Sequence, residues 1–406
     1  MSPDAESNDT AESDDTARPD DTAESNDAVR PNDTASRRAL HELIDLLGEV
    51  DRRWASPEWN LHTDDDIVDA HRALMHMLQW GLVGLFERDP AAPRFHRIVD
   101  PDRKVLGDNP DAIFFDAPVS ADHIYRVTGE TKGAIYTSIT VESGAAWGAM
   151  GNKVVGVLND ESFDVDPDGR FEVVLGGEPR PRNWLALPPS GSISTRHYFE
   201  DPTYAAADPA RVPVMRIEVI DAGGNPVTTP PPRPSDDTVA AGIRRVAGLV
   251  REQTVDRPPA AADRTYTWIS RVPNVFPAPD RPGDLGLAAF DASYAMAPFL
   301  IGPDEALVIR ARWPQCRYAN VCLWNRHLQT FDYASRSISL NRSQTVADAD
   351  GRFTAVIAHT DPGVGNWLDT EGRAFGIVYW RFMLPEGDIE TPRAEVVPVA
   401  ELLSRL

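Results

Sequence analysis

The stretch Asp166–Phe171 reads Asp-Pro-Asp-Gly-Arg-Phe, and it returns as Asp-Ala-Asp-Gly-Arg-Phe at Asp348–Phe353, 182 positions later. A second landmark repeats in the same way, because Asn183–Leu185 and Asn366–Leu368 both read Asn-Trp-Leu and lie 183 positions apart. Landmarks that keep nearly one offset indicate an internal duplication, which must be recognised before a fold is assigned. Two copies are too few for a solenoid, so the repeat predicts two similar domains.

Each copy has the residue pattern of β-strands. Alternating runs of β-branched and aromatic residues contain Tyr136 and Tyr318, which are again 182 positions apart. Turn signals separate further runs at spacings of about 10–20 residues, which is typical of antiparallel sandwiches and jelly rolls. We therefore predict a mainly β fold with two tandem antiparallel β-sandwich domains of the jelly-roll kind, at residues 112–222 and 285–388.

Other segments surround the two predicted sandwiches. Residues 1–36 are acidic hexad repeats without an apolar pattern, so we expect a disordered tail that is either a docking or solubility arm or a repeat without a role. Residues 37–111 have helical periodicity, and residues 223–284 form a proline-rich linker with one helix. Residues 389–406 are a C-terminal extension, in which a proline at position 398 favours a short closing helix.

Composition limits the classes of function. A net charge of −23 argues against nucleic-acid binding, which requires a basic surface. No stretch approaches the roughly 18 apolar residues of a membrane span, and no secretory signal is visible. Cys316 and Cys322 would lie about 20 Å apart along an extended strand, too far for a disulfide. A reducing cytoplasm is therefore the expected compartment.

Two acidic motifs resemble metal sites. Residues 65–69 read Asp-Asp-Ile-Val-Asp, like the motif by which terpene cyclases hold magnesium diphosphate. Acids in the first turn of a helix capped by Thr63 explain them with nothing extra, so we favour helix capping. The repeated Asp-x-Asp-Gly stretches lack the later ligands of a calcium loop and favour hairpin turns. The nine histidines show no metal-ligand spacing. We therefore predict no metal site, and no cofactor is indicated.

The strongest cluster of candidate site residues lies in the second copy. Arg310 and Arg312 share one face of a predicted strand and would hold an anion, while neighbouring rings cover an apolar body. The alternative is an exposed arginine face over an ordinary aromatic core. Likewise, the Asn-Trp-Leu loops either close the ends of the sandwiches or face a ligand across a cleft. The candidate ligand-binding residues are Arg310, Arg312, Tyr318, Trp324, Asn366, Trp367, Trp380 and Arg381, and the candidate acid–base residues are His327 and His359.

The second copy resembles the bacterial family known as domain of unknown function 1214. The resemblance implies tandem jelly-roll-like β-sandwiches with helical additions, and it supplies neither a reaction nor catalytic residues. It covers about a fifth of the chain, and the first copy resembles the family more loosely. The residues that carry it are Tyr318–Trp324, Asp350–Phe353, His359–Gly363, Asn366–Leu368 and the closing strand through Pro385-Glu386.

Three functions remain open at this point. The leading hypothesis is a cytoplasmic protein that binds a small, largely apolar or anionic organic ligand in the second sandwich or in the inter-domain cleft. The alternative is an enzyme of lipid, isoprenoid or other secondary metabolism that uses His327 or His359 with Arg310 or Arg312. The third is an assembly partner, or a homo-oligomer, that docks through the apolar helix Asp66–Phe86.

Overall fold

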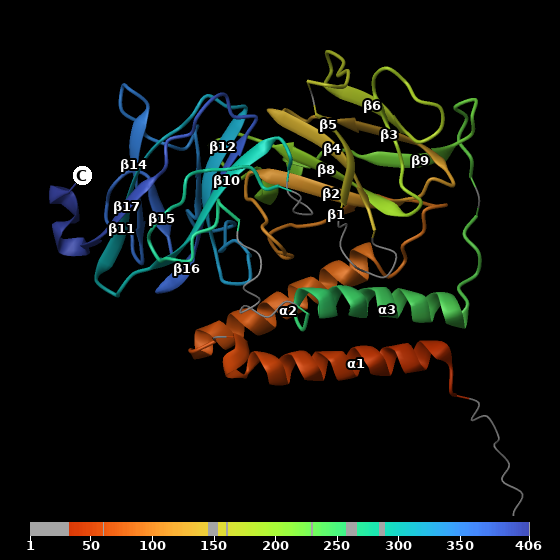
Figure 1. Cartoon of the computed structure of the whole chain (residues 1–406), viewed down its shortest axis with the longest axis horizontal. Coiled ribbons are helices and arrows are strands. Elements are labelled where there is room, and N and C mark those ends of the chain that lie inside the picture. Colours follow the sequence, from red (N-terminus) through yellow and green to blue (C-terminus); the bar gives the residue numbers. More distant parts are fainter. Residues whose placement is uncertain are drawn as a thin grey trace, which may run out of the picture.

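The described part of the chain forms two β-sandwiches side by side over a layer of α-helices, as Figure 1 shows. The computed structural model describes residues 32–59, 61–144, 153–159, 161–228, 230–256, 266–283 and 289–405. The predicted disorder of the acidic tail concerns residues that mostly lie outside this set. Its predicted boundary at residue 36 is too late, because Thr34 already caps the first helix, which begins at Ala35.

The first sandwich has two sheets. One has the strand order β1-β2-β8-β4-β5 and the other β7-β6-β3-β9. All neighbours pair antiparallel except β6 and β7, which are parallel. The strands are β1 His96–Arg97, β2 Ala112–Val119, β3 Ile124–Glu130, β4 Tyr136–Ser143, β5 Lys153–Asn159, β6 Arg170–Leu175, β7 Trp184–Leu185, β8 Gly191–Tyr198 and β9 Arg216–Ile220.

The second sandwich repeats this topology. Its sheets have the orders β10-β16-β12-β13 and β15-β14-β11-β17. Every strand of the second sandwich therefore has a counterpart in the first, whereas the short β1 of the first sandwich has none among the described strands. The predicted boundary at residue 388 is too early, because β17 pairs with β11 and completes the sheet. The strands are β10 Ala292–Leu300, β11 Glu305–Arg312, β12 Tyr318–Trp324, β13 Ser339–Asn341, β14 Arg352–Ala358, β15 Trp367–Asp369, β16 Phe375–Met383 and β17 Arg393–Pro398.

The repeated residues occupy equivalent places in the two sandwiches. Tyr136 begins β4 and Tyr318 begins β12. The strand β4 pairs with β8, and β12 pairs with β16, which is the counterpart of β8. Trp184 and Trp367 stand in the two parallel pairs. Inward-facing apolar residues of the two sheets fill a separate core in each sandwich. The fold is therefore the predicted pair of duplicated sandwiches.

The repeated Asn-Trp-Leu loops support the structure of the sandwich ends. Asn183 and Asn366 have φ values of 53° and 57°, in the left-handed region that asparagine tolerates. Each asparagine donates from Nδ2 to a strand carbonyl at 3.0 Å. The indoles of Trp184 and Trp367 likewise donate from Nε1 to strand carbonyls, at 2.8 and 3.2 Å. The two loops therefore carry the same backbone-capping contacts.

Replacing Asn366 tests this role. We expect Asn366→Ala to lower the free energy of unfolding by about 1–3 kcal/mol, because strand and loop groups lose their partner and alanine disfavours a positive φ. Urea unfolding followed by tryptophan fluorescence measures the change. The same substitution at Asn274, whose φ is also positive, gives a second change in the free energy of unfolding for comparison. A loss below a few tenths of a kcal/mol would contradict the assignment.

The two Asp-Gly stretches are turns, as predicted. Gly169 and Gly351 have φ values of +80° and +82°, and each donates its amide to the aspartate carbonyl three residues earlier at 2.9 Å. Glycine adopts this backbone conformation without the steric cost that a Cβ would add. Among the described residues, no group of three or more His, Cys, Asp or Glu side chains could hold a metal ion.

The helical layer is made from α1 Ala35–Trp54, α2 Asp64–Gly84 and α3 Asp236–Gln253. The helix α3 lies against both others, as Figure 1 shows. Leu74, Met77 and Trp80 of α2 are buried, whereas the apolar side chains of the opposite side are 40–64% exposed, namely Val68, Met75, Leu82 and Val83. Short 3₁₀ segments are η1 Pro57–Trp59, η2 Ala205–Ala207, η3 Pro209–Arg211 and the closing η4 Val399–Ser404.

The acidic start of α2 serves the helix and its packing. Thr63 and Asp66 form a capping box, which satisfies orphan amides of the first turn. Asp66 also pairs with Arg326 at 2.9 Å. Asp69 receives two hydrogen bonds from Arg373, at 2.8 and 3.0 Å. These acids therefore attach the helical layer to the second sandwich. No described helix has the length and apolar character that crossing a membrane requires.

Candidate ligand site between the sandwiches

Three of the sequence-predicted site residues meet in one place. Tyr318, Trp324 and Arg381 lie on the sheet face of the second sandwich that is turned toward the first. Trp380 lies next to Arg381 in β16, but side chains alternate along a strand, so its indole packs into the core. Arg310 is exposed and pairs with Glu395 at 2.6 Å, away from this face.

The remaining predicted residues lie elsewhere. His327 is partly buried, with its ring centroid 5.4 Å from that of Trp54, and burial lowers its pKa to about 4. His359 contacts the Thr370 hydroxyl at 2.7 Å and the Gly302 carbonyl at 3.1 Å. Arg312 is exposed. Asn366 and Trp367 hold the loop described above. The structure therefore does not bring the two histidines together with Arg310 and Arg312.

An aromatic and polar layer fills the contact between the sandwiches. We call it the inter-domain layer. The rings of Tyr198 and Tyr318 meet across it with centroids 4.9 Å apart. Trp324 stacks on Tyr379 at 4.0 Å within the second sandwich. The described members of the layer are Ala112, Tyr136, Tyr198, Trp268, Ala289, Ala292, Tyr294, Tyr318, Cys322, Trp324, Tyr379 and Met383.

Two equivalent hydrogen bonds cross the layer in opposite directions. Tyr318 of the second sandwich donates to Asp111 of the first at 2.9 Å. Tyr136 of the first sandwich donates to Asp291 of the second. Asp111 and Asp291 each precede the first full-length strand of their sandwich, so the two bonds exchange equivalent partners. Such reciprocal contacts are those of an isologous, two-fold interface.

Sequence reasoning missed both of these aspartates. The signal was present, because Asp111-Ala112 and Asp291-Ala292 are the same dipeptide 180 positions apart, each at the start of a predicted strand. A repeated dipeptide is too short to be distinguished from chance without the strand pairing. The structure supplies that pairing and shows the two carboxyl groups facing the opposite tyrosines.

Arg381 is the least satisfied buried charge of the layer. Its residue is 4% exposed, and its guanidinium lies over the rings of Tyr379 and Tyr198, at 4.9 and 5.9 Å from their centroids. Its Nη2 donates to the Gly107 carbonyl at 3.3 Å, while Nη1 has no hydrogen-bond partner among the described residues. Burial opposes the charge, but the surrounding phenols and the Cys322 thiol outweigh it, so the pKa of Arg381 is raised.

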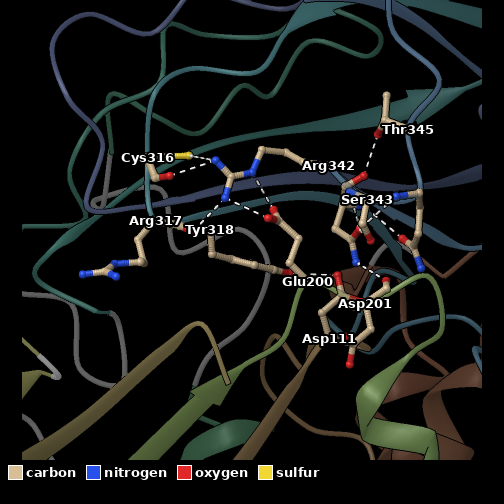
Figure 2. A network of polar contacts seen from close by, with 11 residues as sticks. Asp111, Glu200, Asp201, Cys316, Arg317, Tyr318, Arg342, Ser343 and Thr345 are labelled. Carbon is tan, nitrogen blue, oxygen red and sulfur yellow. Dashed lines mark hydrogen bonds and ion pairs between the residues drawn. The ribbon is translucent and has the colours of Figure 1, made fainter. Parts of the chain in front are cut away.

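Arg342, at the border of the layer, differs from Arg381 because its guanidinium is hydrogen-bonded to a carboxylate. Figure 2 shows its guanidinium held by Glu200 and by the chain around Cys316. It donates to both Glu200 oxygens at 2.6 and 2.8 Å, and to the carbonyls of Cys316 and Arg317 at 2.8 and 2.7 Å. A guanidinium with a bidentate carboxylate is the satisfied arrangement for arginine. Arg381 has no such partner among the described residues.

The other buried charges near Arg381 are partly balanced. Lys104 is 0% exposed and donates from Nζ to the carbonyls of Thr330 and Phe331 at 3.2 and 2.6 Å. Burial lowers its pKa, and the charge of Asp108 opposes that change. Burial raises the pKa of Asp108, and it raises the pKa of Asp111 to about 7 against hydrogen bonds from Tyr318 and Asn341. Asp111 is therefore partly protonated near neutral pH.

The Asp111 pKa makes the stability of the protein depend on pH. The pKa of this carboxyl is about 7 in the folded state and ordinarily 3.8, so the folded state binds the extra proton between these values. Stability is therefore expected to fall as pH rises from about 4 to 7, by roughly 3–4 kcal/mol at most from this group. Asp111→Asn should remove that part of the slope. Urea unfolding of both proteins at a series of pH values measures the difference, and parallel curves would contradict it.

A surface cleft borders the layer at Asp291. Its volume is about 640 Å³, and it lies between β5 of the first sandwich and the end of β16 in the second. Asp291 lines the cleft and also bonds to Tyr136, whose ring lies 5.7 Å from that of Tyr198. Tyr198 in turn contacts Arg381. Side chains that touch one another thus connect the cleft to the buried guanidinium. The cleft is also lined by Asn159, Arg281, Phe290, Leu384 and Glu386.

The comparisons with known proteins concern the fold. The crystal structure of an uncharacterized protein from Burkholderia cenocepacia matches 90% of this chain and 98% of its own, with 26% sequence identity and a TM-score of 0.75. The VPA0106 protein from Vibrio parahaemolyticus matches over 80% of this chain and 99% of its own, with 13% identity and a TM-score of 0.47. No curated protein matches the chain.

The family comparison finds one matching region in each sandwich. Residues 115–202 and 310–387 both match the family described as "Protein of unknown function (DUF1214)". The first match lies within the first sandwich and the second match within the second. Each sandwich therefore carries a region of this family, and the chain resembles the DUF1214 family as a tandem, two-domain protein.

Proposed function

We propose that this protein binds a small, largely apolar organic molecule in the inter-domain layer. The observation that carries the proposal is a pair of buried polar atoms without partners among the described residues. They are Nη1 of Arg381, a donor, and Oδ1 of Asn320, an acceptor. The two residues are direct cross-strand neighbours in β12 and β16. A donor and an acceptor side by side are the groups that fix the polar end of a ligand.

Buried polar groups in proteins are ordinarily hydrogen-bonded. Leaving one such group unsatisfied costs about 1–3 kcal/mol, and more for a charged group. The rings of Tyr198, Tyr294 and Tyr379 surround Arg381, so an apolar body would find aromatic contacts beside the polar pair. A ligand that entered from the cleft at Asp291 would have to move the buried rings of Tyr136 and Tyr198 to reach Arg381.

Ligand-induced stabilisation tests this proposal. Native mass spectrometry of protein purified from its host is expected to show a small molecule that dissociates on unfolding. Adding that molecule to stripped protein should raise the midpoint of thermal unfolding. Asn320→Leu should abolish the rise. The matched control is Asn225→Leu, at an exposed asparagine after β9, in the sheet of the first sandwich that does not form the layer. A bound molecule whose effect survives Asn320→Leu would contradict the proposed site.

A further inference from the structure

We infer that the ligand is a monocarboxylate, whose carboxylate group takes, beside Arg381, the role that the Glu142 side chain has beside Arg196 in the first sandwich. This inference rests on the proposed ligand site and identifies the chemical class that it accepts. The evidence is a comparison of equivalent positions within the chain itself. The inner faces of both sandwiches are filled with apolar residues, whereas the outer faces that form the inter-domain layer have diverged.

The strand register establishes which positions are equivalent. Tyr136 and Tyr318 begin the corresponding strands β4 and β12. The cross-strand partner of Ser138 is Arg196, and the cross-strand partner of Asn320, at the same place in the second copy, is Arg381. Both sandwiches therefore carry a buried arginine at one equivalent position.

The two arginines have different surroundings. In the first sandwich, Arg196 donates to the Thr140 hydroxyl at 2.6 Å, and its Nη2 lies 3.8 Å from a Glu142 oxygen. The positions equivalent to Thr140 and Glu142 are Cys322 and Trp324. Neither a thiol nor an indole supplies a negative charge, since burial raises the pKa of Cys322. The second sandwich thus keeps the buried guanidinium and lacks the carboxylate.

A charge count in the layer favours a single negative charge on the ligand. The buried cation Lys104 and the buried carboxyl Asp108 act on each other. Arg342 is neutralised by Glu200. Asp111 is partly ionised at neutral pH and acts on Arg381, so at most one positive charge is left uncompensated at Arg381. A second carboxylate on the ligand would enter a low-dielectric region without a cation, which is strongly unfavourable.

The shape of the layer indicates the rest of the molecule. The stacked rings of Trp324 and Tyr379 form a flat wall beside the guanidinium, because Arg381 also lies over Tyr379. Gly107, whose carbonyl accepts from Arg381, has a φ of +87°, and a Cβ there would lie 3.1 Å from the Trp324 ring. The backbone therefore approaches the wall closely. Both rings are buried, so an aromatic or otherwise flat apolar body would have to displace part of this packing to lie against them.

Probes of different charge on the same ring test the inference. Phenylacetate, phenylacetamide and 1,4-phenylenediacetate share one ring and carry one, no and two negative charges. Isothermal titration of the full chain is expected to show phenylacetate binding about 10- to 100-fold more tightly than either other probe, from the charge-assisted hydrogen bonds. Octanoate and octanamide repeat the comparison with an aliphatic body. Equal affinity of acid and amide would overturn the carboxylate assignment and leave the ligand site in place. Tightest binding by the dianion would overturn the charge count.

Restoring the carboxylate of the first sandwich provides a second test. Trp324→Glu places a carboxylate at the position equivalent to Glu142, and it is expected to weaken phenylacetate binding at least 10-fold more than Trp324→Gln, which removes the same ring without adding charge. Equal losses in the two variants would contradict the inference. If none of the five probes binds the unaltered chain and no co-purified molecule is found, the proposed function itself fails. If a neutral molecule is found at the site, only the inference fails.

Discussion

Lys104→Met is expected to lower the free energy of unfolding by about 3–5 kcal/mol, because it removes a buried cation that donates to two carbonyls and balances the charge of Asp108. The Lys104 side chain is fully buried, and its ammonium group donates to two carbonyls of the second sandwich. Its loss leaves those carbonyls without a donor and leaves the buried Asp108 carboxyl without its cation. Methionine keeps the length and the apolar stem of the side chain, so packing alone does not explain such a loss.

Chemical unfolding at pH 7 and pH 5 measures this effect. The destabilisation should shrink at the lower pH, because Asp108 without its cation binds a proton more readily. Asp108→Asn in the Lys104→Met background should recover part of the stability. Lys153→Met serves as the control, since Lys153 is exposed on β5 and should change stability by less than about 0.5 kcal/mol. Similar losses in the two lysine variants would show that Lys104 has no special role.

Arg381→Met is expected to reduce the affinity for the ligand strongly and the free energy of unfolding little, whereas Lys104→Met is expected to reduce the free energy of unfolding strongly. The variant should lose at least about 100-fold in affinity for the bound ligand, because the charged hydrogen bonds at the polar end disappear. Its ligand-free form, however, should be no more than about 1 kcal/mol less stable than the unaltered chain, and it could be more stable. The reason is that the variant loses one hydrogen bond of 3.3 Å and two contacts with ring faces, but it also removes the cost of burying a charge.

Two measurements on one sample separate these outcomes. Titration with phenylacetate gives the affinity, and urea unfolding without ligand gives the stability. Arg312→Met is the matched control, at an exposed arginine of β11 for which both values should stay unchanged. A stability loss of 3–5 kcal/mol in Arg381→Met, like that expected for Lys104→Met, would mean that the guanidinium is already satisfied within the chain. That result would remove the basis of the proposed ligand site.

The sequence predicted the architecture because the duplication and the strand pattern are local signals. The repeated Asp-Gly turns and Asn-Trp-Leu loops lie at corresponding places of both sandwiches, and the β-rich fold with a helical layer was predicted correctly. The boundary at residue 388 was wrong, because β17 is a short edge strand whose pairing with β11 spans about 85 residues of chain. Pairings over such distances leave no mark in a local pattern.

The candidate site was only partly predictable. Tyr318, Trp324 and Arg381 stood out as aromatic and basic residues in strong strands, but so did Trp380 and Arg310. Which of them share a face toward the other sandwich depends on how two whole domains pack, and no periodicity encodes that. Lys104 and Asp108 were missed because they lie in an irregular segment before β2, where charged residues are ordinarily exposed.

The two exchanged tyrosine–aspartate bonds have a consequence for assembly. Because each half offers the other the same pair of groups, the first sandwich of one chain would fit the second sandwich of a different chain equally well. The segment at residues 223–284 keeps the partners together by holding the local concentration of one half near the other high. A much shorter connection would lead two chains to swap halves, giving dimers in which every bond across the layer survives but links separate polypeptides.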